Sequence, residues 1–121
     1  MSLRITSYIL ALIFAASGSA KLLSLPFEVE AFTRWGYSPA FMYVTGALEV
    51  LGAIGLLMPR LSSLASLCLA ALMLGAIATH LLHGEWPMLA VASAIMLTAF
   101  FRGWAGRADI NAINKRSKLR N

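Results

Sequence analysis

The sequence predicts an all-α integral membrane protein, a bundle of four transmembrane helices with both termini in the cytoplasm. Its 121 residues are 60% hydrophobic and only 12% charged, whereas a soluble domain carries about 25% charged residues because its surface is hydrated. Four apolar runs are separated by polar breaks, and each is close to the ~20 residues that a helix needs to cross a bilayer. Together these observations exclude a soluble globular fold.

The four expected spans form one domain over residues 1–104. Their ranges are 3–23, 40–58, 61–82 and 86–104. Turn and helix-stop residues separate them, namely Pro59, Gly84 with Pro87, and the stretch 24–39. The first run also resembles a secretory signal, with Arg4 before its apolar stretch and small residues at 18–20 as a cleavage site. We expect a retained span instead.

Lys and Arg are distributed unequally between the expected loops. With the N-terminus inside, the cytoplasmic side holds Arg4, Arg60, Arg102, Arg107, Lys115, Arg116, Lys118 and Arg120. The outer side holds only Arg34 and Lys21. Because positive residues stay on the cytoplasmic side of short loops, this bias predicts that both termini are inside.

The basic residues around and after the end of the last apolar run, Arg102 included, are assigned to a juxtamembrane tail. Residues 105–121 are expected to form a cytoplasmic tail that faces anionic lipid headgroups. No base-reading module precedes this tail, so we do not expect nucleic acid as a partner.

The first outer connection, residues 24–39, is long and partly amphipathic. Phe27, Ala31 and Trp35 recur at helical spacing, which indicates a short helix lying in the membrane interface. It is either an aromatic anchor that sets depth or a lid over an outward-facing pocket. Trp35 and Tyr37 are the candidate lid residues.

Three ionisable residues within the spans are candidates for function, because charge in a membrane is costly. Lys21 and His80 lie near the outer ends of the first and third spans, and Glu49 lies near the middle of the second. Residues on adjacent helical turns share their faces: Ser17 with Lys21, Thr45 with Glu49, and Thr79 with His80. We expect either a Lys21–Glu49 ion pair, with Thr45 placed to bridge the gap between them, or a protonated Glu49 that donates a hydrogen bond. In both arrangements His80 and the aromatic connection close the site from outside.

Simpler interpretations of these residues compete with a binding site. Lys21 and Glu49 can serve only to hold two helices in register. His80 and His83 have the spacing of two metal ligands, with Glu85 as the nearest third, but we predict no metal site. The abundant small residues indicate close helix packing, with a homo-oligomeric interface as the alternative.

Several short motifs resemble one family. Gly18-x-x-Lys21 ends the first span, a Trp-Gly-Tyr-Ser-Pro segment occupies residues 35–39, and Gly46-x-x-Glu49 leads into a second glycine-rich stretch. Gly-Ala-Ile-Ala-Thr-His-Leu follows at 75–81. Over about residues 14–102, the chain resembles the DoxX-like family of small four-helix bacterial membrane proteins.

The resemblance implies a location in the bacterial inner membrane and several different roles. Relatives include membrane subunits of a thiosulfate:quinone oxidoreductase, partners of oxidative-stress complexes, and distant eukaryotic chaperones of receptor assembly. If the quinone association applies, Lys21, Glu49 and His80 would face a quinone headgroup or another small amphiphile. No catalytic residue is implied for this chain.

Three functional hypotheses follow. The first is an accessory or binding subunit that holds a small amphiphile, a quinone or a lipid, on the outer side and serves another membrane or redox protein. The second is a structural or chaperone-like partner without a ligand. The third is a proton-coupled transporter that uses Glu49, which we rank lower because four helices give no inverted repeat. The residues predict no reaction for the chain by itself.

Overall fold

The computed structural model describes residues 2–112, and within this range the protein is helical without strands. Its long helices are α1 (Leu3–Leu22), α3 (Pro39–Leu57), α4 (Ser62–Leu82) and α5 (Trp86–Ala105). All four are long and apolar enough to cross a membrane, and their bounds differ from the predicted spans by at most one residue. A short helix, α2 (Pro26–Trp35), joins α1 to α3. The all-helical prediction is confirmed, whereas residues 113–121 of the predicted tail lie outside the described residues.

Local sequence signals place the helix ends. Ser2 and Ser38 cap α1 and α3 with hydroxyl oxygens that accept backbone N–H groups three residues later. Pro39 is at the first position of α3, where its missing N–H costs nothing. Gly36 ends α2 in the left-handed conformation, with φ of 83°. These residues turn the chain sharply between α2 and α3.

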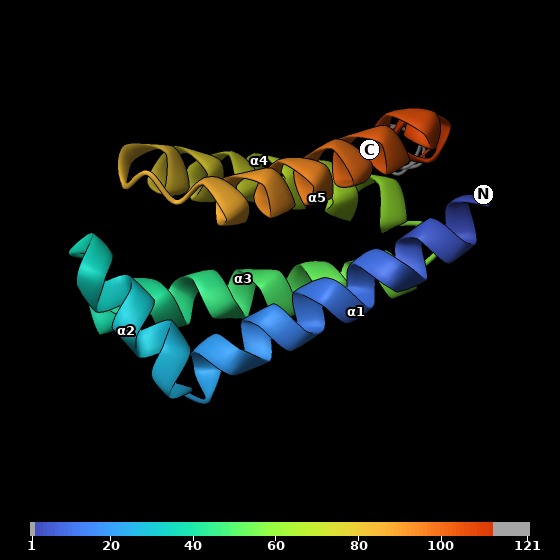
Figure 1. Cartoon of the computed structure of the whole chain (residues 1–121). Coiled ribbons are helices and arrows are strands. Elements are labelled where there is room, and N and C mark those ends of the chain that lie inside the picture. Colours follow the sequence, from blue (N-terminus) through green and yellow to red (C-terminus); the bar gives the residue numbers. More distant parts are fainter. Residues whose placement is uncertain (1, 113–121) are drawn as a thin grey trace.

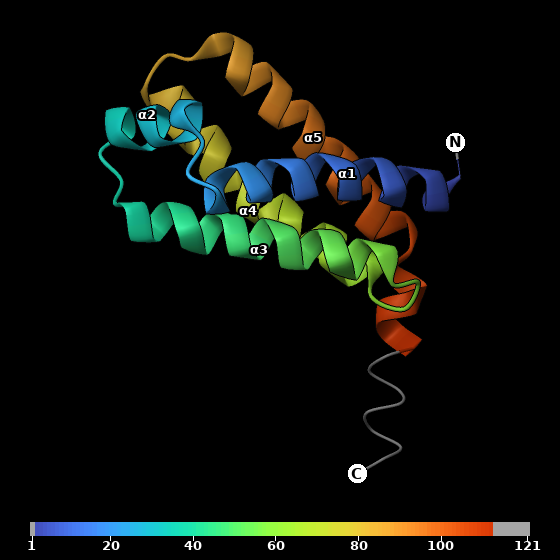
Figure 2. The same ribbon diagram turned by 90° about the horizontal axis from the view of Figure 1, so that it is seen from below.

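The long helices form two pairs that diverge toward one end. α1 packs along α3 and α4 along α5, while contacts between the pairs are sparser. Figure 1 shows the pairs close together near the N-terminus and farther apart toward α2. In Figure 2, α2 lies across the diverging end of the bundle. We call this the α2 end, and the opposite end the terminal end.

The apolar core fills the region where the two pairs meet. Leu10 and Phe14 from α1, Leu56 from α3, Leu69 from α4 and Ala99 from α5 are almost completely buried there. Burying such side chains holds the pairs together at the terminal end and centre. Toward α2, the same space contains polar side chains and a cavity.

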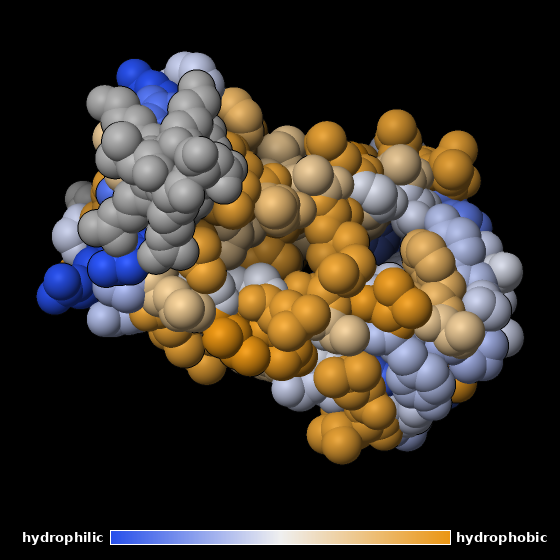
Figure 3. All heavy atoms as spheres, turned by 180° about the vertical axis from the view of Figure 1, so that it is seen from behind, coloured by the Kyte–Doolittle hydropathy of each residue, from blue (hydrophilic) through white to orange (hydrophobic). Residues whose placement is uncertain are grey.

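The outer surface of the bundle is suited to hydrocarbon. Large apolar side chains such as Leu12, Leu51 and Leu97 are exposed on α1, α3 and α5. Figure 3 shows this apolar belt around the middle of the molecule, with hydrophilic residues at both ends. An exposed apolar surface of this extent requires a lipid environment.

Two glycines bring α1 and α3 into close contact. A Cβ atom at Gly18 would lie 2.6 Å from the carbonyl oxygen of Gly46, and one at Gly46 would lie 2.9 Å from the carbonyl oxygen of Gly18. Side chains at these positions would therefore collide with backbone. Reciprocal small residues allow helix backbones to approach in membranes, and here they also place Lys21 against Gly46.

One sequence-based expectation about position is wrong. Arg102 was expected in the exposed basic tail, but it is buried within α5 and hydrogen-bonded to serines on α1 and α4. On α2, Phe27 is 60% exposed, which agrees with an interfacial position, and Phe32 is buried against the bundle. The inward face of α2 therefore contains Glu28, Phe32 and Trp35, spaced by four and three residues as on one helical face.

We predict that Gly46→Ala lowers the free energy of unfolding by about 1–3 kcal/mol, the usual cost of an extra methyl group in a packed site. Gly75→Ala is the matched control, because a Cβ there has no neighbour within 4 Å. Denaturation of the two variants in detergent, followed by circular dichroism, measures the difference. Equal loss of stability in both would contradict the assigned role of Gly46.

Candidate functional site

A cavity of about 330 Å³ lies at the α2 end, between the two helix pairs and beneath α2. All five helices contribute to its wall. Polar groups from α1, α2 and α3 line one part, and apolar side chains such as Met73 of α4 and Ile95 of α5 line another. The divergence of the helix pairs therefore creates an amphipathic space inside the membrane domain.

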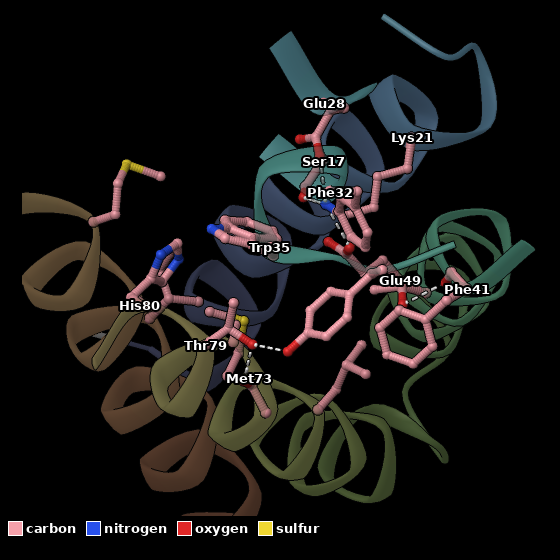
Figure 4. Close-up of a pocket in the computed structure, with 18 of the residues that line it drawn as sticks. Ser17, Lys21, Glu28, Phe32, Trp35, Phe41, Glu49, Met73, Thr79 and His80 are labelled. Atoms are coloured by element: carbon pink, nitrogen blue, oxygen red, sulfur yellow. Dashed lines mark hydrogen bonds and ion pairs between the residues drawn. The ribbon is translucent and has the colours of Figure 1, made fainter. Parts of the chain in front are cut away.

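An ammonium group between two carboxylates forms the polar centre of the cavity. Lys21 Nζ lies 2.8 Å from Glu49 Oε1 and 3.6 Å from Glu28 Oε2. The same nitrogen donates a hydrogen bond to Ser17 Oγ at 2.9 Å, one turn earlier on α1. Figure 4 shows these four side chains, from α1, α2 and α3, gathered on one side of the cavity. The side chains of Lys21 and Glu49 are only 10% and 6% exposed.

The charges in this cluster do not cancel. One lysine faces two glutamates, so the formal charge of the Lys21–Glu49–Glu28 group is −1 when all three are ionised. An ionised carboxylate can accept hydrogen bonds but cannot donate them. Glu49 Oε2 and Glu28 Oε1 do not take part in the contacts with Lys21. The polar side of the cavity is therefore rich in hydrogen-bond acceptors.

A third carboxylate, that of Glu85 in the connection between α4 and α5, binds side chains of α2. Arg34 Nη2 donates to its Oε2 at 2.7 Å, and Trp35 Nε1 donates to its Oε1 at 2.9 Å. His80 Nδ1 lies 2.9 Å from the same Oε1. The hydrogen bond with His80, followed by those with Arg34 and Trp35, lowers the pKa of Glu85 from 4.5 to about 2.

Aromatic side chains close the α2 end above the cavity. Phe32, Trp35, Tyr37 and Phe41 contact one another with ring centroids 5.0–6.2 Å apart. The Tyr37 hydroxyl is also 2.8 Å from Thr79 Oγ1 on α4. The Tyr37–Thr79 contact connects the segment between α2 and α3 to α4, and the aromatic rings cover the cavity at this end.

The structure places all eight predicted site residues around this cavity. Five of them make polar contacts inside it, of which the Lys21–Glu49 pair was predicted: Ser17, Lys21, Glu49, Tyr37 and Thr79. His80 and Trp35 line the wall and also bind Glu85. Thr45 lines the cavity but does not bridge Lys21 and Glu49, since its hydroxyl donates to the carbonyl of Phe41 at 2.9 Å. The two charged groups meet directly instead.

Sequence reasoning missed the roles of Glu28 and Glu85. Glu28 follows Lys21 by seven residues, but the turn at Ser24, with φ of 53°, reverses the chain between them. Glu85 was considered only as a metal ligand with His80 and His83. It reaches His80, whereas His83 Nδ1 contacts the carbonyl of Thr79 at 2.8 Å. Within residues 2–112, no three His, Cys, Asp or Glu side chains are grouped as metal ligands.

Comparison with known proteins identifies relatives but no described activity. The model of the DoxX-like family matches residues 5–102, which confirms the resemblance found in the motifs. A protein of Bacillus subtilis (strain 168), named uncharacterized protein YdgD, is 30% identical over 91 residues, covering 72% of this chain and 80% of the relative. No solved structure matches the chain.

The lowered pKa of Glu85 predicts a pH-dependent contribution to stability. Because the folded-state pKa is below the ordinary value, the contribution is complete above about pH 4.5 and is lost as the pH falls toward about 2. The difference in melting temperature between wild type and Glu85→Gln should therefore shrink as detergent-solubilised protein is acidified. Glu30→Gln is the control, since Glu30 is exposed on α2 and has no ion pair among the described residues. A difference that stays constant between pH 6 and pH 3 would exclude this linkage.

Proposed function

The chain belongs to the DoxX-like family, and from this premise we propose that it is a membrane protein that binds a small amphiphile in the cavity at the α2 end. The observation that carries the proposal is the Lys21–Glu49–Glu28 cluster, which borders a space of about 330 Å³. A pair that served only helix registration would not need such a space beside it. An amphiphile fits because the cavity has a polar side and an apolar side.

The acceptor-rich cluster favours a headgroup that donates hydrogen bonds. Lys21 Nζ already donates to Ser17 Oγ and lies 2.8 Å from Glu49 Oε1, while Glu49 Oε2 and Glu28 Oε1 do not take part in these contacts. A phenol, alcohol or amine would donate to these oxygens. Among quinones, the reduced form carries two hydroxyl donors and the oxidised form carries only acceptors, so we propose tighter binding of the quinol.

We propose that α2 is the lid of this cavity, with Trp35 and Tyr37 as its contacts. Both residues line the space and both reach across to the α4–α5 pair, through Glu85 and Thr79. Breaking these bonds would free α2 from that pair while α2 stayed attached to α1 and α3. The lid and the binding cluster are thus parts of the same proposal.

The ligand proposal predicts that a small molecule copurifies with the protein and depends on the cavity. Mass spectrometry of extracts should find it in wild-type protein and find about tenfold less in Glu49→Gln, which removes a charge-assisted hydrogen bond. Ala76→Phe should also exclude it, because Ala76 lines the cavity and a phenyl ring would fill the space. Leu97→Ala, on the exposed face of α5, is the control.

Titration then identifies the headgroup. A short-chain quinol, the matching quinone and an alkyl alcohol are added to the purified protein, and binding is followed by tryptophan fluorescence, because Trp35 lines the cavity. The proposal requires binding that Ala76→Phe abolishes. Equal responses in wild type and Ala76→Phe would favour a structural partner without a ligand, for which Lys21→Met with Glu49→Leu should retain the fold.

We further propose that the α2 end faces the outside of a bacterial inner membrane. The support is the bias of Lys and Arg toward the terminal end, where Arg4, Arg60 and Arg107 are exposed. In a Cys68→Ser background, the thiol introduced by Glu30→Cys should react with a membrane-impermeant maleimide in intact cells. A cysteine at Arg60 should react only after lysis. The reverse pattern would invert the assignment without changing the cavity.

A further inference from the structure

A second cavity lies at the opposite end of the bundle. Its volume is about 230 Å³, and it is bordered by the start of α1, the end of α3, the start of α4 and the end of α5. Arg4, Ser7 and Arg102 are among its polar lining groups. This cavity shares no lining residue with the one beneath α2.

Arg102 is a buried cation whose described partners are neutral. It is 5% exposed, its Nε donates to Ser7 Oγ at 2.6 Å, and its Nη1 donates to Ser63 Oγ at 2.9 Å. Ser63 passes its own hydrogen to the carbonyl of Gly106 at 2.8 Å, which leaves its oxygen free to accept from Arg102. Within residues 2–112, no carboxylate oxygen lies within 4.0 Å of this guanidinium, and its Nη2 has no hydrogen-bond partner.

The positive charge of Arg102 therefore has no compensating negative charge within 4.0 Å among the described residues. Removing a guanidinium from water is costly unless an anion or several strong acceptors compensate it, and two serine hydroxyls are neutral acceptors. Exposed Arg4 adds a second positive charge at the same cavity. Asp109 also lines it, but this exposed carboxylate forms no ion pair with either arginine. The formal charge of Arg4, Arg102 and Asp109 together is +1.

We propose that the cavity at the terminal end binds a phosphate-type oxyanion through Arg102 and Arg4. The planar guanidinium, fixed by two serines, presents its remaining nitrogen as a directed donor, and oxyanions match this geometry. The cavity lies where the spans end, at headgroup depth, so an anionic phospholipid supplies this chemistry directly. Free phosphate is the other source of the same group.

The test compares lipids and variants on the intact chain in mild detergent. Native mass spectrometry should show that wild type retains phosphatidylglycerol in preference to zwitterionic phosphatidylcholine. Arg102→Gln should reduce that retention about tenfold, the loss expected from one hydrogen bond to a charged group. Arg60→Gln should not, because Arg60 is an exposed arginine at the same end that does not line the cavity.

Two exposed positions keep the test decisive if Arg102→Gln does not fold. Arg4→Gln should weaken phosphatidylglycerol retention. Asp109→Asn should strengthen retention, because it removes a negative charge that repels the lipid phosphate. If phosphatidylglycerol shows no preference but inorganic phosphate raises the melting temperature of wild type and not of Arg102→Gln or Arg4→Gln, the oxyanion site stands with free phosphate as its ligand. If no variant changes the response to lipid or phosphate, the proposal is overturned and Arg102 only links α1 to α4.

Discussion

The close approach of α1 and α3 is the constraint on which the rest of the structure depends. Gly18 and Gly46 let the two backbones touch, and this contact puts the Lys21 stem beside Gly46, one turn from Glu49 on α3. With bulkier residues there, the ammonium and the carboxylate would be farther apart in a medium that solvates neither. The close packing of the small residues therefore makes the polar cluster possible, because it brings the opposite charges near enough to stabilise each other in hydrocarbon.

The two helix pairs then divide the bundle into a packed half and a hollow half. Large side chains such as Phe14 and Leu56 fill the space near the termini, where the pairs meet. Toward α2, the neighbouring positions of α4 and α5 are small, including Gly75, Ala76 and Ala92, and all three line the cavity. The polar groups face this space rather than lipid, which follows the general rule that intramembrane charge points into a bundle.

Much of this architecture was predictable from the sequence, and the reason is physical. Hydrocarbon enforces the length and polarity of every span, so the four helices and the inward Lys21–Glu49 pair follow from apolar runs and helical periodicity. Other features depend on tertiary geometry that periodicity does not contain. The burial of Phe32 on α2 was not predicted, because helical spacing alone does not select which aromatic residue packs against the bundle. Arg102 was misplaced because its partner Ser7 lies 95 residues away in the chain.

Glu85 has a consequence for what the cavity can accept. α2 is attached to α1 and α3 by short connections, whereas Glu85 belongs to the connection between α4 and α5. The hydrogen bonds from Arg34 and Trp35 to Glu85 thus link the α1–α3 pair to the α4–α5 pair. A ligand that required the two helix pairs to separate further would have to break these hydrogen bonds, whereas a ligand that fits the existing cavity would leave them intact. The width of a molecule bound as we propose would therefore be limited by the hydrogen bonds from Arg34 and Trp35 to Glu85.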